Sequence, residues 1–70
     1  MGDAMRTHVP IPVVATHDLR RGQGPLIKRG TPGELTEVTG SQYTVMFWPF
    51  GADGMTVVIN NLSRLDLKEA

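Results

Sequence analysis

The residues Thr31-Pro-Gly-Glu-Leu-Thr-Glu-Val-Thr-Gly-Ser-Gln-Tyr-Thr-Val-Met-Phe47 join a Pro-Gly turn, two runs of β-favouring residues and a short polar turn. Antiparallel strands joined by tight turns have this pattern. Pro32 presets the first central residue of a type II turn and Gly33 accepts the positive φ of the second, so we expect a strand from Glu34. The segment predicts the middle of a small all-β barrel.

Both strands of this segment show where their side chains point. Leu35 and Val38 lie three positions apart where alternation requires two, which predicts a β-bulge or a strong twist. Gly40-Ser41 predicts a tight hairpin. In the next strand one set of side chains should face the core and the other set the outside. The core set is Tyr43, Val45 and Phe47, and the outer set is Thr44, Met46 and Trp48.

The segments before this centre predict a leader, a strand and a loop. Residues 1–8 are polar and aperiodic, so we expect a disordered leader before one domain at 9–70. The first strand should begin near Val13, because the two prolines before it lack the amide that a central strand donates. Glycine and proline break any helical period in residues 16–31, which predicts a long loop. Leu26 and Ile27 should anchor this loop in the core.

The segments after the centre predict a return strand and a closing strand. Residues 49–54 form a turn-rich tip, and residues 56–59 follow as a strand. Asn60 or Asn61 should cap one helical or 3₁₀ turn. Leu62 and Leu65 of this turn should face inward, and Leu67 should end a short last strand. The plan is a five-stranded barrel with a long first loop and one 3₁₀ turn before the last strand.

Size and composition restrict the function. The 70 residues form one small domain, which leaves little room for a deep enzyme pocket in one copy. The chain has no cysteine, so disulfides and thiolate metal sites are excluded, and a reducing, cytoplasmic location is expected. No apolar run approaches the roughly 20 residues of a membrane span. We expect a soluble protein without catalytic residues, cofactor or membrane partner.

The order of features resembles a superfamily of small Src-homology-3-like (SH3-like) barrels. The matching residues are Lys28-Arg-Gly-Thr-Pro-Gly-Glu-Leu35, Tyr43-Thr-Val-Met-Phe47, Leu62 and Asp66-Leu67. The superfamily includes the ferredoxin-docking subunit of photosystem I, the variable chain of ferredoxin–thioredoxin reductase, the nitrile hydratase β-subunit and the nitrogen-fixation accessory protein NifZ. The resemblance implies a docking or accessory module. KOW-type nucleic-acid modules look similar over residues 28–39.

A basic loop is the first candidate binding feature. Arg20, Arg21, Lys28 and Arg29 follow one another without an intervening acid, although seven basic and seven acidic residues cancel over the whole chain. Such a patch can steer an acidic protein or a phosphate backbone. The alternative is that these cations only solvate the loop or pair with nearby acidic side chains. The candidates for those local pairs are Asp18, Glu34 and Glu37.

An aromatic tip is the second candidate. Trp48 and Met46 are expected on the outer face and Phe50 at the loop tip, where exposed apolar surface is typical of an interface hot spot. The alternative is that the two aromatic rings fold over a barrel end as a minor core. A homodimer would use this patch as naturally as a foreign partner.

The remaining polar residues do not assemble into a predicted catalytic or metal site. His8 and His17 are the only imidazoles, and zinc needs three or four ligands on a rigid frame. His17-Asp18 could form a dyad, but no nucleophile is placed near it. We therefore expect no metal. The predicted function is a noncatalytic adaptor for a protein partner, with nucleic-acid binding as the alternative and an oligomeric enzyme as a third class.

Overall fold

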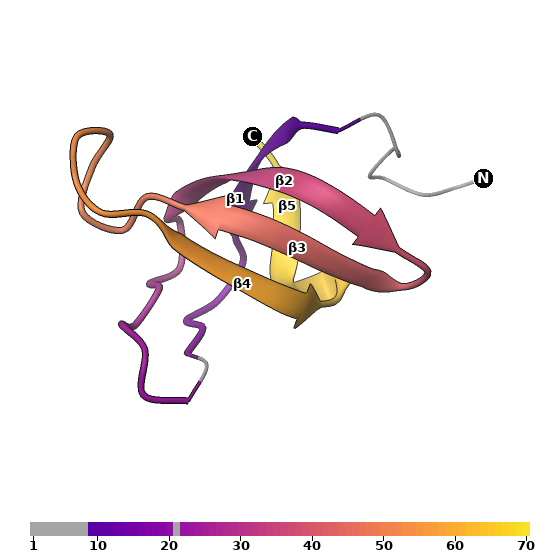
Figure 1. The fold of residues 1–70 in the computed structure, drawn as a ribbon, viewed down its shortest axis with the longest axis horizontal. Coiled ribbons are helices and arrows are strands. Elements are labelled where there is room, and N and C mark those ends of the chain that lie inside the picture. Colours follow the sequence, from indigo (N-terminus) through magenta and orange to yellow (C-terminus); the bar gives the residue numbers. More distant parts are fainter. Residues whose placement is uncertain (1–8, 21) are drawn as a thin grey trace.

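The protein is one curved antiparallel sheet with a single helical turn (Figure 1). The computed structural model describes residues 9–20 and 22–70, so the expected leader at residues 1–8 and Arg21 lie outside the described residues. The order across the sheet is β4-β3-β2-β1-β5. The elements are β1 (Ile11–Ala15), β2 (Pro32–Thr39), β3 (Gln42–Phe47), β4 (Val57–Leu62), the 3₁₀ helix η1 (Arg64–Asp66) and β5 (Leu67–Glu69).

The five antiparallel strands, the long first loop and the 3₁₀ turn before the last strand are confirmed. The expected closure into a barrel was wrong. β4 and β5 stand at opposite ends of the strand order, and the hydrogen-bonded sheet stays open between them. β5 is only three residues long and pairs with β1, while η1 fills the connection from β4. In Figure 1, β5 passes behind β2 and β3, which shows how strongly the open sheet curves.

The core lies on the concave face of this sheet and follows the predicted alternation. The inward side chains of β3 are at most 7% exposed, which confirms the predicted core set. Ile27 is fully buried as an anchor of the long loop, but Leu26 is 37% exposed and does not join the core. An isolated bridge pairs Ile27 with Leu19, and neighbouring side chains on an extended segment point to opposite sides. The buried core residues are Val13, Ala15, Leu19, Ile27, Leu35, Tyr43, Val45, Phe47, Ile59, Leu62 and Leu67.

The turn before β2 lies closer to the N-terminus than predicted. The amide of Thr31 donates to the carbonyl of Lys28 at 3.0 Å, and Gly30 has the positive φ of 88° that a type II turn requires at its third residue. β2 therefore starts at Pro32, and Gly33 is a buried strand residue. A type II turn needs a glycine at its third position, and Gly30 occupies that position. Gly33 lies in β2 instead, where it is buried.

Two bulges bend the sheet. The first falls between Leu35 and Glu37 in β2, which confirms the irregular spacing read from the sequence. The second falls in the β3–β4 pair, where Asn61 adopts a φ of 62°. Asparagine tolerates this left-handed conformation better than most residues. β4 thus continues past Ile59 to Leu62 instead of ending where the sequence predicted.

The cap of η1 was assigned to the wrong residue. Ser63 is the N-cap, its hydroxyl accepts the amide of Leu65, and Asp66 accepts the amide of Ser63 to complete a capping box. Leu62 and Leu67 are buried, as expected, but Leu62 lies in β4 rather than in the turn, and Leu67 begins β5 instead of ending it. Leu65 is 77% exposed and does not face inward. The reason is that η1 is a single turn on the surface with no buried residue, so the side chain of its middle residue does not pack against the core.

Candidate functional site

The convex face of the sheet carries the outward side chains of β3. Trp48 and Met46 alternate with buried Val45 and Phe47, so they lie on the face away from the core. Both are half-buried, and Trp48 is not among the residues packed into the core. The alternation therefore places the indole of Trp48 on the outer face, as expected, and neighbouring residues cover part of its surface.

On the convex face, Trp48 begins a row of residues that lie side by side on neighbouring strands. The amide of Trp48 donates to the carbonyl of Pro32 at 3.0 Å, and Pro32 is paired with Val14 of β1. Val14 is in turn paired with Lys68 of β5. Because all four residues alternate with inward neighbours, the row Trp48, Pro32, Val14, Lys68 crosses the convex face from an indole to an ammonium group.

A second row lies beside the first. Val58 pairs with Met46, Met46 with Glu34, and Glu34 with Pro12. Val58 is 62% exposed at the edge of the sheet, and Glu34 is the acidic residue of this row. We call the apolar members of both rows the outer patch. The outer patch consists of Pro12, Val14, Pro32, Met46, Trp48 and Val58.

The tip between β3 and β4 places Phe50 in solvent. Phe50 is 60% exposed, and the loop at residues 49–56 projects from one end of the sheet in Figure 1. A turn links the amide of Gly51 to the carbonyl of Trp48 at 3.4 Å. Phe50 therefore does not fold over the sheet as a minor core.

The described basic residues of the long loop are all exposed to solvent. Arg20, Lys28 and Arg29 are exposed, and Arg21 lies outside the described residues. The carboxylate of Asp18 accepts the backbone amide of Arg29 at 2.9 Å, so an acid stands beside this end of the loop. Among the described cations of the loop, Arg29 lines a hollow next to Val14 of the convex face.

Arg29 and Lys68 line a shallow hollow of about 320 Å³ at the end of the Trp48 row. The other lining residues are Val14, Ala15, Thr16 and Gly30. Across the described ranges, neither Arg29 nor Lys68 has a carboxylate partner for its side chain. The hollow can therefore accept an anionic group beside an apolar surface. Sequence reasoning missed Lys68, because only the β1–β5 register brings it to Val14.

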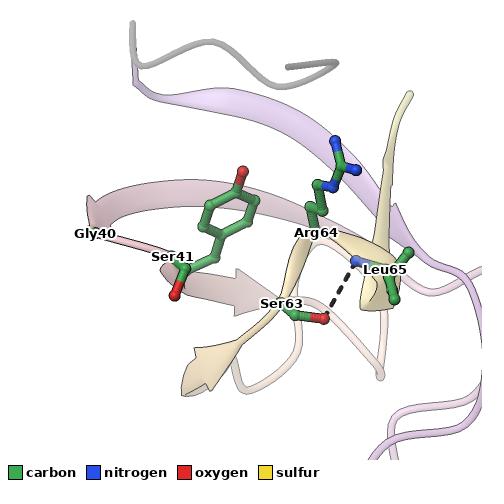
Figure 2. A pocket seen from close by; sticks show the side chains of 6 residues that line it. Gly40, Ser41, Ser63, Arg64 and Leu65 are labelled. Atoms are coloured by element: carbon green, nitrogen blue, oxygen red, sulfur yellow. Dashed lines mark hydrogen bonds between the residues drawn. The ribbon is translucent and has the colours of Figure 1, made fainter. Parts of the chain in front are cut away.

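A second hollow, of about 400 Å³, lies between the β2–β3 hairpin and η1 (Figure 2). It is lined by Gly40, Ser41, Tyr43, Ser63, Arg64 and Leu65. The hydroxyl of Ser63 accepts the amide of Leu65 at 3.2 Å, so it is engaged in capping η1. The same hydroxyl lies 3.4 Å from Oδ2 of Asp66, which is not among the lining residues. The hollow itself offers shape and the charge of Arg64.

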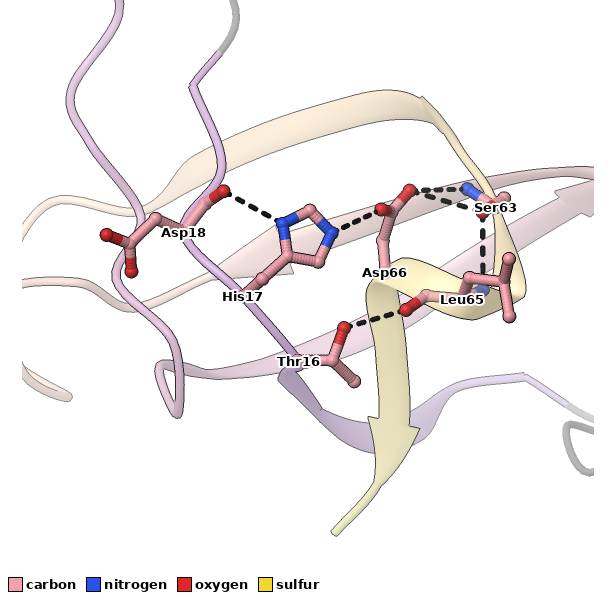
Figure 3. A network of polar contacts seen from close by, with 6 residues as sticks. All are labelled: Thr16, His17, Asp18, Ser63, Leu65 and Asp66. Atoms are coloured by element: carbon pink, nitrogen blue, oxygen red, sulfur yellow. Dashed lines mark hydrogen bonds and ion pairs between the residues drawn. The ribbon is translucent and has the colours of Figure 1, made fainter.

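A polar network joins His17 to η1 (Figure 3). The Nε2 of His17 lies 2.7 Å from Oδ1 of Asp66, and its Nδ1 lies 3.0 Å from the backbone carbonyl of Asp18. Thr16 adds a hydrogen bond from its hydroxyl to the carbonyl of Leu65 at 2.7 Å. Both partners of the imidazole are acceptors, so both ring nitrogens donate when the ring is protonated. The network therefore favours the imidazolium.

The order of groups in this network differs from that of a hydrolytic triad. In a triad the imidazole stands between the hydroxyl and the carboxylate, whereas here Asp66 stands between Ser63 and His17. Burial of Asp66 opposes its ionisation, but hydrogen bonds from Ser63 and His17 outweigh it and hold the pKa of this carboxyl below its usual value. A carboxylate with a lowered pKa is a weak base. The network is suited to holding the loop against η1.

The network predicts a pH-dependent stability. The hydrogen bond to Asp66, followed by the bond to the Asp18 carbonyl, raises the pKa of His17 above 6.5. Because the pKa of His17 is raised in the folded state, protonation of His17 stabilises the fold fully below pH 6.5, and this stabilisation is lost as the pH rises through the raised pKa. Because the pKa of Asp66 is lowered, its ionised form stabilises the fold above pH 3.8, and this stabilisation is lost as the pH falls through the lowered pKa. We expect His17→Gln to lower the free energy of unfolding more at about pH 5.5 than at about pH 8.5. Urea unfolding of both proteins at the two pH values measures this difference, and an NMR titration of His17 with a midpoint at or below 6.5 would contradict it.

Two findings concern metal-ligand clusters and membrane-spanning helices among the described residues. Among residues 9–20 and 22–70, no three His, Asp or Glu side chains gather in a way that could hold a metal ion. His8 lies outside these ranges. No helix in the part of the chain that the structure describes is long and apolar enough to cross a membrane.

Comparison with known proteins gives no match for this chain. No protein-family model matches the sequence, and no similar protein was found among curated proteins or solved structures. The fold and the convex face are thus the observations from which a function is argued.

Proposed function

We propose that the protein is a noncatalytic interaction module that binds a protein partner on the outer patch. The observation that carries the proposal is the strand register, which gathers six apolar residues from four strands on the face opposite the core. Apolar side chains clustered on one exposed face are typical of protein-binding surfaces. Trp48 lies next to Met46 and Pro32 in this patch, and tryptophan is the residue type most often found as a binding hot spot.

The charges around the patch indicate what the partner presents. The Trp48 row ends at the hollow between Arg29 and Lys68, which favours an acidic or phosphorylated group on the partner. An apolar segment followed by an acidic residue would lie along this row. The resemblance to SH3-like docking and accessory subunits supports the same class of function, and the proposal includes membership of that superfamily.

Removal of the indole is expected to abolish most of the binding. Trp48→Ala should weaken partner binding by about 2 kcal/mol or more, because the indole is the largest side chain of the patch and a partner would bury its exposed part. Affinity capture from a lysate with the wild-type protein, followed by titration of the captured partner against both proteins, measures the loss. Thr39→Ala changes an exposed residue outside the patch and serves as the matched control. Equal affinities of the Trp48 and Thr39 variants would reject the proposed site.

Nucleic-acid binding is a second candidate, favoured by Trp48 at one end of its row and by the cations Lys68 and Arg29 around the hollow at the other end. A base would stack on the indole while Arg29 and Lys68 contact phosphates. Titration with labelled RNA and DNA at two salt concentrations distinguishes the candidates, since phosphate contacts give a steep dependence of affinity on salt. Absence of binding to both nucleic acids at low salt leaves the protein partner as the function.

A further inference from the structure

The two edge strands of the sheet differ in how they are protected. β5 has three residues, two of which are Lys68 and Glu69, and short charged edges resist pairing with another strand. β4 has six residues, Val57–Leu62, and contains neither a charged residue nor a proline. Within the described ranges β4 is paired only with β3, so no strand pairs with the other side of its regular part, from Val57 to Asn60. An extended polypeptide strand is the ligand that satisfies such an edge.

We propose that two copies of this chain pair through their β4 strands, in antiparallel orientation, around a two-fold axis at Val58. An antiparallel strand is its own complement under two-fold symmetry, so the same residues meet from both sides. A charged edge would bring identical charges together at such an axis, and β4 has none to bring. The second copy therefore meets no electrostatic penalty at this edge.

The register about Val58 matches side chains on both faces. On the convex face the 62% exposed Val58 meets Val58 of the second copy, and Thr56 meets Asn60. On the concave face half-buried Val57 lies opposite Ile59 of the second copy, but Ile59 is only 4% exposed, so most of the new side-chain contact comes from the convex face. Asn61, with its φ of 62°, marks the end of the regular segment. The axis at Val58 uses the straight part of β4 and stops before that bulge.

The arrangement has a consequence for binding. A two-fold axis perpendicular to a continuous sheet leaves both convex faces on the same side, so two outer patches stand next to each other. A partner with two copies of the recognised segment would then bind with an avidity above the affinity of a single patch. The proposed pairing of the two copies does not involve Trp48, because Trp48 directly follows β3 and does not lie on the edge strand β4.

The test is the oligomeric state at rising protein concentration. A five-residue pairing segment is a small interface, so we expect a weak dimer that forms between about 10 µM and 1 mM. Val58→Lys and Val58→Asp should each raise the dissociation constant at least tenfold by placing like charges at the axis, whereas an equimolar mixture of the two variants should restore the dimer. Light scattering coupled to size-exclusion chromatography, with analytical ultracentrifugation, measures all three samples.

Val58 belongs to both the proposed interface and the outer patch, so the controls change residues that lie outside the interface. Thr44→Lys adds the same charge to the convex face of β3, away from the edge, and should leave the dissociation constant unchanged. Trp48→Ala should also leave it unchanged, so loss of partner binding and loss of the dimer are distinguishable. A wild-type protein that stays monomeric at about 1 mM overturns the proposal. So does a mixture of the Lys and Asp variants that stays monomeric while circular dichroism shows both variants folded.

Discussion

Val45→Asp is expected to unfold the protein. Val45 has 0% of its surface exposed, at the centre of β3, with paired strands on both sides. An isolated carboxylate at this position loses its hydration without gaining a partner, which costs several kcal/mol. A domain of this size has a stability of about 4–10 kcal/mol, so the loss is comparable with the total. Circular dichroism and urea unfolding measure the outcome.

The matched control is the neighbouring position on the opposite face. Thr44→Asp puts the same carboxylate on the convex face, where the side chain reaches water, and should cost about 1 kcal/mol or less. Its pairing partner Glu37 is also acidic, which accounts for a small loss from like charges. Equal unfolding by the two variants would contradict the assignment of β3 side chains to an inner and an outer face.

Gly33→Ala is expected to destabilise the protein by about 2–4 kcal/mol, which is large for the addition of one methyl group. A Cβ at Gly33 would lie 2.8 Å from Cδ1 of Phe47, 2.9 Å from the carbonyl oxygen of Met46 and 2.9 Å from Cγ1 of Val45. One of these neighbours is backbone, and the two side chains are fully buried, so none can move without opening the core. Thermal unfolding of the variant measures the loss.

A second alanine variant shows whether the loss of stability in Gly33→Ala comes from the close approach of the new Cβ to β3. Thr39→Ala lies in the same strand, in an exposed position, and should change the free energy of unfolding by no more than about 0.5 kcal/mol. A Gly33→Ala protein as stable as this control would mean that β2 and β3 are further apart than the structure places them.

The central hairpin could be predicted from the sequence because its signals are local. Alternation of apolar and polar residues over residues 43–47 gives the inner and outer faces of β3, and Gly40-Ser41 gives the turn. The three-residue spacing of Leu35 and Val38 gives the bulge. Leu65 was misplaced because a leucine after a capping residue normally faces a core, and only the full path of the chain shows that η1 lies on the surface.

The candidate site could be predicted only in part. Trp48 and Met46 follow from the alternation within one strand, but Val14, Pro32 and Lys68 reach them through pairing between strands. That register depends on the two bulges and on the turn at Gly30, and a one-residue change in any of these moves a whole strand to the other face. The open sheet was missed for a related reason, because strand lengths and not strand patterns determine whether the first and last edges meet.

The pairing of β1 with β5 affects how the chain reaches its native state. Val13 and Glu69 are partners although 56 positions separate them, while β2, β3 and β4 pair through consecutive hairpins. Contacts between distant residues carry a larger loop-closure entropy and slow folding. We therefore expect the hairpins of the meander to form early and the pairing of β1 with β5 to form late. During synthesis on the ribosome, the sheet cannot be completed until β5 has left the exit tunnel.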